Sequence, residues 1–232
     1  MTMPALLLTA LRSEAAILRT AGLTPHVVGV RAHRLGGESV LRMVTTAPGT
    51  VLLVGYAGGL LPAQHPGDVI VATDVRDERG HVIATARPAV VAAALSALRD
   101  AGLDATAGGL ISVGRFVRRS ADRYRLAATG AVAVDMESAP VALAARHALL
   151  VVRVLVDTPA DGVVTAVAGH AWRLGRVLAR AARAAYHACD CAELPTSENS
   201  APSGSVEMAT PTSDTRPPDD RLAATTDRGK GN

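Results

Sequence analysis

Two short apolar runs, each followed by an acidic residue, constrain the fold of this chain most strongly. Residues 131–134 and 149–156 are predicted to be buried strands, and the segment between them has the composition of a helix. A strand–helix–strand unit places both strand ends on one edge of a parallel sheet, where ligands of open α/β sheets bind. We therefore expect the acids at these strand ends, Asp135 or Glu137 and Asp157, to share one crevice, which suggests chemistry that needs a hydrogen-bond acceptor and a proton donor together.

The rest of the chain alternates in the same way. Predicted strands cover 5–10, 26–30, 50–55, 68–77, 82–85, 105–113, 131–135 and 149–157, and predicted helices cover 13–21, 32–46, 88–100, 120–129, 138–147 and 168–188. A glycine turn is expected after residue 55. This order predicts an α/β protein, namely a three-layer α/β/α sandwich with a mostly parallel central mixed sheet.

Composition predicts one folded domain, residues 1–190, followed by a disordered polar tail, residues 191–232. Pro, Ser, Thr, Asp and Gly dominate the tail, which has no apolar periodicity. The domain is long enough for a sizeable core. Because 49% of the chain is hydrophobic but only 2% is aromatic, that core must consist of Ala, Val and Leu.

The sequence also argues against several functions. Its arginines are scattered and are not clustered with aromatic residues, so no nucleic-acid partner is expected. No apolar run approaches the roughly 18 residues of a membrane span, and the start does not resemble a signal peptide, so we expect a cytoplasmic protein. No histidines or cysteines pair at metal-ligand spacing, so neither a metal nor a cofactor is expected.

Three segments resemble the purine nucleoside phosphorylase and nucleosidase superfamily, in the family's order and over roughly residues 4–190. They are Leu6–Glu14, then Val54–Leu60 with Pro66–Ala72, then Ala133–Ser138 with Val152–Asp157. The segments are most similar to methylthioadenosine/S-adenosylhomocysteine nucleosidases and hopanoid-associated phosphorylases. The resemblance implies a phosphorylase-like fold, an enzyme that cleaves the N-glycosidic bond of a purine nucleoside, and a homodimer or higher oligomer.

The resemblance also implies catalytic roles. Asp157 would protonate the purine at N7, because a neutral purine leaves more easily than its anion, and burial at a strand end suits a carboxyl to proton transfer. Glu14 would position or deprotonate the attacking water. The alternatives are that Asp157 caps the next loop and that Glu14 is an ordinary exposed helix acid.

Further residues would hold the sugar. Glu137 would accept from the ribose 2′ and 3′ hydroxyls, and Met136 would pack on the sugar. Glu137 could instead simply stabilise a helix start. Asp135 is the alternative diol ligand, although strand alternation turns it away from Met136.

The base would lie against residues from two other segments. Phe116 would stack on the purine, unless it is an ordinary core residue, and Val117 would contribute backbone contacts. Ala57 and Gly58 would line the pocket beside Tyr56. Because Tyr56 stands where the family often has Ser or Thr, which can help to bind phosphate, water is favoured as the nucleophile.

The predicted function is therefore hydrolysis of a purine nucleoside, in particular a 5′-substituted adenosine. One alternative is phosphorolysis of the same class of nucleoside, adenosylhopane-type substrates included, with phosphate as co-substrate bound by Arg12 or Arg115. The other is a family member that binds a nucleoside without turnover. It is suggested by the shortened region 22–50 and by the unusual residues Tyr56, Arg115 and Val156.

Overall fold

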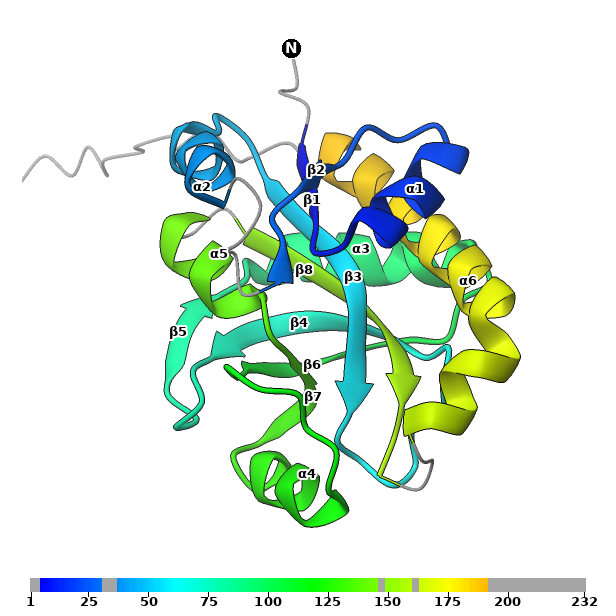
Figure 1. The fold of residues 1–232 in the computed structure, drawn as a ribbon. Helices are drawn as coiled ribbons and strands as arrows, with labels where there is room; N and C mark the ends of the chain where they lie inside the picture. Colours follow the sequence, from blue (N-terminus) through cyan, green and yellow to red (C-terminus); the bar gives the residue numbers. More distant parts are fainter. Residues whose placement is uncertain (1–4, 31–36, 146–148, 160–162, 192–232) are drawn as a thin grey trace, which may run out of the picture. The chain divides into compact units, whose positions relative to one another are not determined.

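The computed structural model describes residues 5–30, 37–145, 149–159 and 163–191 (Figure 1). Residues 192–232 of the predicted disordered tail lie outside the described residues, as do the first part of the helix predicted for 32–46 and the end of the one predicted for 138–147.

The elements follow the predicted order with modest shifts at their ends. The strands are β1 (Leu6–Thr9), β2 (His26–Val27), β3 (Val51–Gly59), β4 (Val69–Arg76), β5 (Val82–Thr85), β6 (Ala105–Ser112), β7 (Ala131–Asp135) and β8 (Leu149–Asp157). The helices are α1 (Arg12–Thr20), α2 (Gly37–Thr46), α3 (Pro88–Asp100), α4 (Ser120–Ala127), α5 (Ser138–Ala145) and α6 (Val163–Cys191). Helix α6 begins five residues before the predicted position 168.

The strands form one mixed sheet that curls back on itself. Strand β3 runs parallel to β1 and β8, and β6 runs parallel to β4 and β7. Antiparallel pairs join β3 to β7 and β4 to β8. As a result β3, β7, β6, β4 and β8 close a ring, while β1, β2 and β5 lie outside it. The predicted α/β class and the mostly parallel mixed sheet are confirmed.

Helices cover both faces of the sheet (Figure 1). Helices α1, α3 and α6 pack over one core of small aliphatic side chains, and α2 and α5 pack over a second core on the other face. Helix α4 packs beside β7 over a third, smaller cluster. Leu, Val and Ala fill all three, as the scarcity of aromatic residues requires. None of the described helices is long and apolar enough to cross a membrane.

The glycine turn predicted after residue 55 is wrong, because β3 continues through the glycines to Gly59. The strand stays paired with β8 as far as Gly58, which lies opposite Asp157. Gly55, Gly58 and Gly59 do not adopt positive φ angles. They are needed instead because side chains cross closely over the strand, which leaves no room for a β-carbon.

Candidate active site

A cavity of about 250 Å³ opens where several strands end, and its wall is mostly apolar. Strands β1, β3, β7 and β8 each place residues at or near their carboxyl ends on it, as does the segment after β6. Of the residues predicted from the sequence to form the site, all but Arg12 line this cavity, namely Glu14, Tyr56, Ala57, Gly58, Arg115, Phe116, Val117, Met136, Glu137 and Asp157. Arg12 is an exposed residue of α1 and is not part of the wall.

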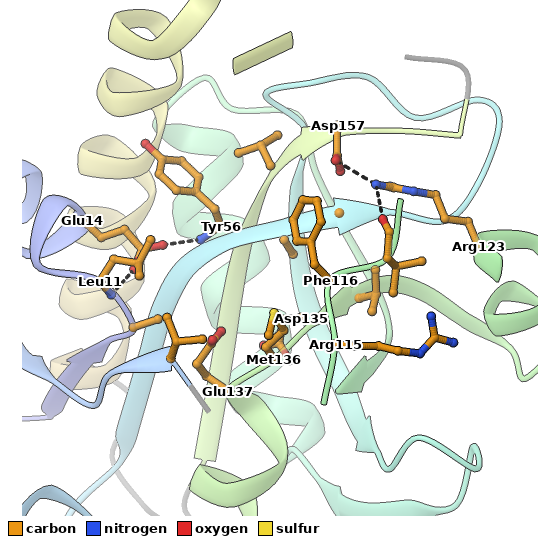
Figure 2. A pocket seen from close by; sticks show the side chains of 17 residues that line it. Leu11, Glu14, Tyr56, Arg115, Phe116, Arg123, Asp135, Met136, Glu137 and Asp157 are labelled. Atoms are coloured by element: carbon orange, nitrogen blue, oxygen red, sulfur yellow. Dashed lines mark hydrogen bonds and ion pairs between the residues drawn. The ribbon is translucent and has the colours of Figure 1, made fainter. Parts of the chain in front are cut away.

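Glu14 lies on one side of the cavity (Figure 2) and is held there by three hydrogen bonds. Its Oε2 accepts from the Thr9 hydroxyl and from the backbone N–H of Leu11, each at 2.8 Å. Its Oε1 accepts from the backbone N–H of Tyr56 at 2.9 Å. The side chain is 1% exposed, so the alternative of an ordinary exposed helix acid is wrong. The Leu11 bond also caps the start of α1.

Asp157 lies on the opposite side of the cavity from Glu14 and forms a buried ion pair (Figure 2). Its Oδ2 accepts from Nη2 of Arg123 at 2.7 Å, and both side chains are almost fully buried. The other oxygen, Oδ1, has no hydrogen-bond partner within the described parts of the chain. Asp157 therefore lines the cavity with a carboxyl group in which one oxygen is held by Arg123 and the other has no hydrogen bond from the described residues.

Gly58 allows the Asp157 side chain to take its position, because the Asp157 and Arg123 side chains pass directly over this glycine. A β-carbon at position 58 would lie 2.9 Å from Asp157 Oδ1 and 3.0 Å from Arg123 Nη1. We predict that Gly58→Ala displaces the acid, lowering activity at least tenfold and the free energy of unfolding by about 1–3 kcal/mol, the usual cost of overpacking.

Steady-state kinetics and urea unfolding test this prediction. The matched control is Gly175→Ala in α6, where the nearest side-chain atom is 3.5 Å from the added β-carbon. Alanine suits a helix interior, so this control should not lose stability. Wild-type activity in Gly58→Ala would contradict the assignment of Asp157 to the reaction.

Asp135, the last residue of β7, and the next two residues, Met136 and Glu137, all line the cavity. Glu137 is largely buried there. The Asp135 carboxylate accepts from the backbone N–H and hydroxyl of Ser138 and from Nη2 of Arg153, which ties it to α5 and β8. Glu137, as predicted from the sequence, stays the candidate for the ribose hydroxyls.

Arg153 is fully buried in the middle of β8, next to Glu14. A β-carbon on Gly55 would lie 2.6 Å from Arg153 Nη1 and 2.9 Å from Glu14 Oε1, so both side chains pass close over this glycine. The Arg153 guanidinium forms its ion pair with the Asp135 carboxylate, which offsets both buried charges.

The segment between β6 and α4 lines the part of the cavity where the base is predicted to bind. The Phe116 ring lines the cavity and is 54% exposed, so the alternative of a core residue is wrong. The Arg118 guanidinium lies 5.7 Å from the ring centroid. Arg115 also lines the cavity, but its guanidinium is 3.7 Å from Glu78 and 3.5 Å from Asp122, two acids that offset its charge.

Tyr56 lines the cavity beside Glu14, which accepts a hydrogen bond from its backbone N–H. Burial, with a smaller contribution from the nearby Glu14 charge, raises the pKa of the Tyr56 phenol to about 12. The phenol therefore stays protonated at neutral pH. At this position it contributes apolar surface and a neutral hydroxyl group, without a charge that would attract phosphate.

Arg123 and Arg153 were not predicted from the sequence to belong to the site. Arg153 could have been, because a charged residue inside an eight-residue apolar run must be buried with a partner. Arg123 could not, since it lies among other arginines in a polar helix. Described His, Cys, Asp and Glu side chains do not gather in threes at any place that could hold a metal ion.

The chain is similar to known proteins both in sequence and in fold. Residues 38–190 match the family model of the phosphorylase superfamily. No curated protein matches the chain significantly. Among solved structures, the 5′-methylthioadenosine/S-adenosyl homocysteine nucleosidase of Campylobacter jejuni superposes with a TM-score of 0.67 at 16% identity, covering 81% of this chain and 99% of that one.

Two structures from Helicobacter pylori are similarly close. A mutant nucleosidase with 5′-methylthioadenosine in its active site has a TM-score of 0.66 at 18% identity, covering 82% of this chain and 99% of that one. A futalosine hydrolase mutant has a TM-score of 0.68 at 16% identity, and the match covers 79% of this chain and 98% of that one. At these identities the likeness establishes a shared fold.

Proposed function

Because the chain belongs to the phosphorylase superfamily, as its sequence motifs predicted, we propose that it hydrolyses the N-glycosidic bond of a 5′-substituted adenosine. Membership makes it an enzyme of N-glycosyl bond cleavage, so the proposal concerns the substrate and the nucleophile. The observation that carries it is the pair of buried carboxyl groups, Glu14 and Asp157, on opposite sides of one mostly apolar cavity.

Each group has a role that its surroundings support. In the reacting complex Asp157 carries a proton on Oδ1, which it gives to N7 of the purine, and the electron pair of the C1′–N9 bond passes to the base as that bond breaks. A water molecule forms the new bond to C1′ and gives a proton to Glu14. Glu137 accepts hydrogen bonds from the ribose hydroxyls, which stabilises positive charge near C1′, as in other glycoside cleavage. The products are free base and free sugar.

The surroundings of the cationic residues favour water over phosphate. Within the described part of the chain, the arginines on the cavity wall are Arg115 and Arg123. Arg115 faces Glu78 and Asp122, and Arg123 is bonded to Asp157 and to two carbonyl oxygens. Arg123 therefore has no guanidinium edge open to the bidentate contact that binds phosphate best, and Arg115, which is half exposed, already shares its charge between two carboxylates. Phosphorolysis remains the alternative to be tested.

The apolar cavity suits a nucleoside with an apolar 5′ group. Leu11, Val30 and Val156 line it beside Tyr56 and Phe116, and several of these residues are partly exposed. Burial of an apolar 5′ substituent against them would contribute about 25 cal/mol for each Å² removed from water. The solved nucleosidase that holds 5′-methylthioadenosine supports this choice of substrate class.

Product analysis tests the nucleophile. The purified chain is incubated with adenosine, inosine, methylthioadenosine and S-adenosylhomocysteine, with and without phosphate, and the products are separated by chromatography. We expect free base and free sugar in both buffers. A sugar 1-phosphate formed only with phosphate would replace hydrolysis by phosphorolysis and direct attention to Arg115.

Glu14→Gln is expected to lower kcat by about 10²–10⁴-fold, the usual range for loss of a general base. Glutamine keeps the size of the side chain but cannot take a proton from water. Steady-state kinetics with methylthioadenosine measure the effect, and Ser13→Ala, an exposed neighbour on α1, is the control. If Glu14 only caps α1, the variant will lose thermal stability while the folded fraction keeps its kcat.

A further inference from the structure

Arg123 holds three separate parts of the cavity wall together. Its Nη1 donates to the carbonyl oxygen of Gly59 at 2.8 Å, at the end of β3. Its Nη2 donates to the Val117 carbonyl oxygen at 3.1 Å and to Asp157 Oδ2 at 2.7 Å. The residue itself belongs to α4 and is 2% exposed. A surface arginine that happened to be near an acid would not be this deeply buried or this fully bonded.

Resting on the function proposed above, we propose that Arg123 is a positioning residue that sets the orientation of the acid Asp157 relative to the segment that receives the base. By occupying Oδ2, the guanidinium leaves Oδ1 as the oxygen that can meet a ligand. By bonding to the Val117 carbonyl, it fixes the segment that carries Phe116. The proton donor and the stacking surface are thereby held in one geometry.

The Arg123 guanidinium also stabilises the charge that the reaction produces on Asp157. When Oδ1 passes its proton to the base, negative charge develops on the Asp157 carboxylate, and the Arg123 guanidinium is already bonded to the other oxygen. The charge is therefore stabilised by a partner that need not reorient. Lysine could supply the charge, but a single ammonium group lacks the planar fork that reaches two carbonyl oxygens and a carboxylate together.

A double-mutant cycle tests this role. Arg123→Met and Asp157→Asn are made singly and together, and kcat and KM are measured with methylthioadenosine, alongside thermal unfolding of each variant. A misplaced catalytic group can cost about 10²-fold, so we expect Arg123→Met to lower kcat by about that factor. In the Asp157→Asn background the same change should alter kcat by less than about threefold, since residues that act as a unit are not additive.

Two further variants give the comparison its controls. Arg125→Met removes an exposed arginine from the same helix and should leave kcat unchanged. Arg123→Lys keeps the charge near Asp157 and should recover part of the lost kcat without recovering all of it. If Arg123→Met does not fold, Arg123→Lys in the two backgrounds provides the same cycle.

The outcomes separate this inference from the proposed function. Equal loss of kcat in both backgrounds, or a loss confined to KM, would overturn the positioning role while hydrolysis stands. If the wild-type chain releases no base from any of the four nucleosides and does not bind adenine in calorimetry, the proposed function fails, and the positioning role fails with it. Failure of the proposed function would therefore be seen in the wild-type chain, without any of the variants.

Discussion

The Asp157→Asn variant is expected to bind a nucleoside normally and to cleave it about 10²–10⁴-fold more slowly than the wild type. Asparagine has nearly the same shape as aspartate and can still accept a hydrogen bond from Arg123, but it cannot give a proton to the base. The wild-type carboxyl group is 2% exposed, so water cannot easily take over that role. The effect should therefore appear in kcat and leave KM within a few-fold.

The measurement is base release from methylthioadenosine under saturating conditions, with the folded fraction checked by circular dichroism. Asp100→Asn, at the exposed end of α3, is the matched control and should behave as the wild type. Because asparagine leaves the Arg123 charge buried without an anionic partner, some stability should also be lost. A variant that is folded and fully active would mean that Asp157 only pairs with Arg123.

Arg153→Met is expected to reduce the free energy of unfolding by about 3–5 kcal/mol, the range for breaking a buried ion pair. Arg153 is completely buried and bonds to Asp135 and Ser138 beneath the cavity. Methionine fills a similar volume but leaves the Asp135 carboxylate buried without its cation. Urea unfolding followed by circular dichroism measures the loss, and Arg99→Met on the exposed side of α3 is the control.

A second substitution makes this prediction specific to charge. Asp135→Asn removes the unpaired negative charge and keeps a side-chain oxygen that can still accept from Ser138. The double variant Arg153→Met/Asp135→Asn should therefore be more stable than Arg153→Met alone. If Asp135→Asn instead adds its own full loss to that of Arg153→Met, the two residues do not form an energetically coupled pair.

The element order could be predicted from sequence because each strand is a short apolar run bounded by turn or helix signals. Strand β8 is the clearest case, since its predicted limits, 149–157, are those of the structure. The same local reasoning failed at Gly55–Gly59. Glycines usually indicate a turn, but here they mark places where Glu14, Arg153 and Asp157 cross the strand. That crossing depends on residues far away in the sequence.

The carboxylates of the site were predictable for the same reason, since each lies where an element starts or ends. Their partners were not. Arg123 is 34 residues from Asp157, and nothing in the pattern of α4 distinguishes it from Arg119 or Arg125. The choice among these arginines is made by the register of α4 against β7, which is a tertiary packing effect.

Base release by the wild-type chain in phosphate-free buffer tests directly whether this cavity frees a purine base from its nucleoside. Methylthioadenosine is the first substrate, and adenine and the free sugar are quantified together against time. We expect them to appear in equal amounts, at a rate that Asp157→Asn and Glu14→Gln each reduce strongly. If the folded wild-type chain releases no base from any of the four nucleosides, with or without phosphate, the proposed function is wrong.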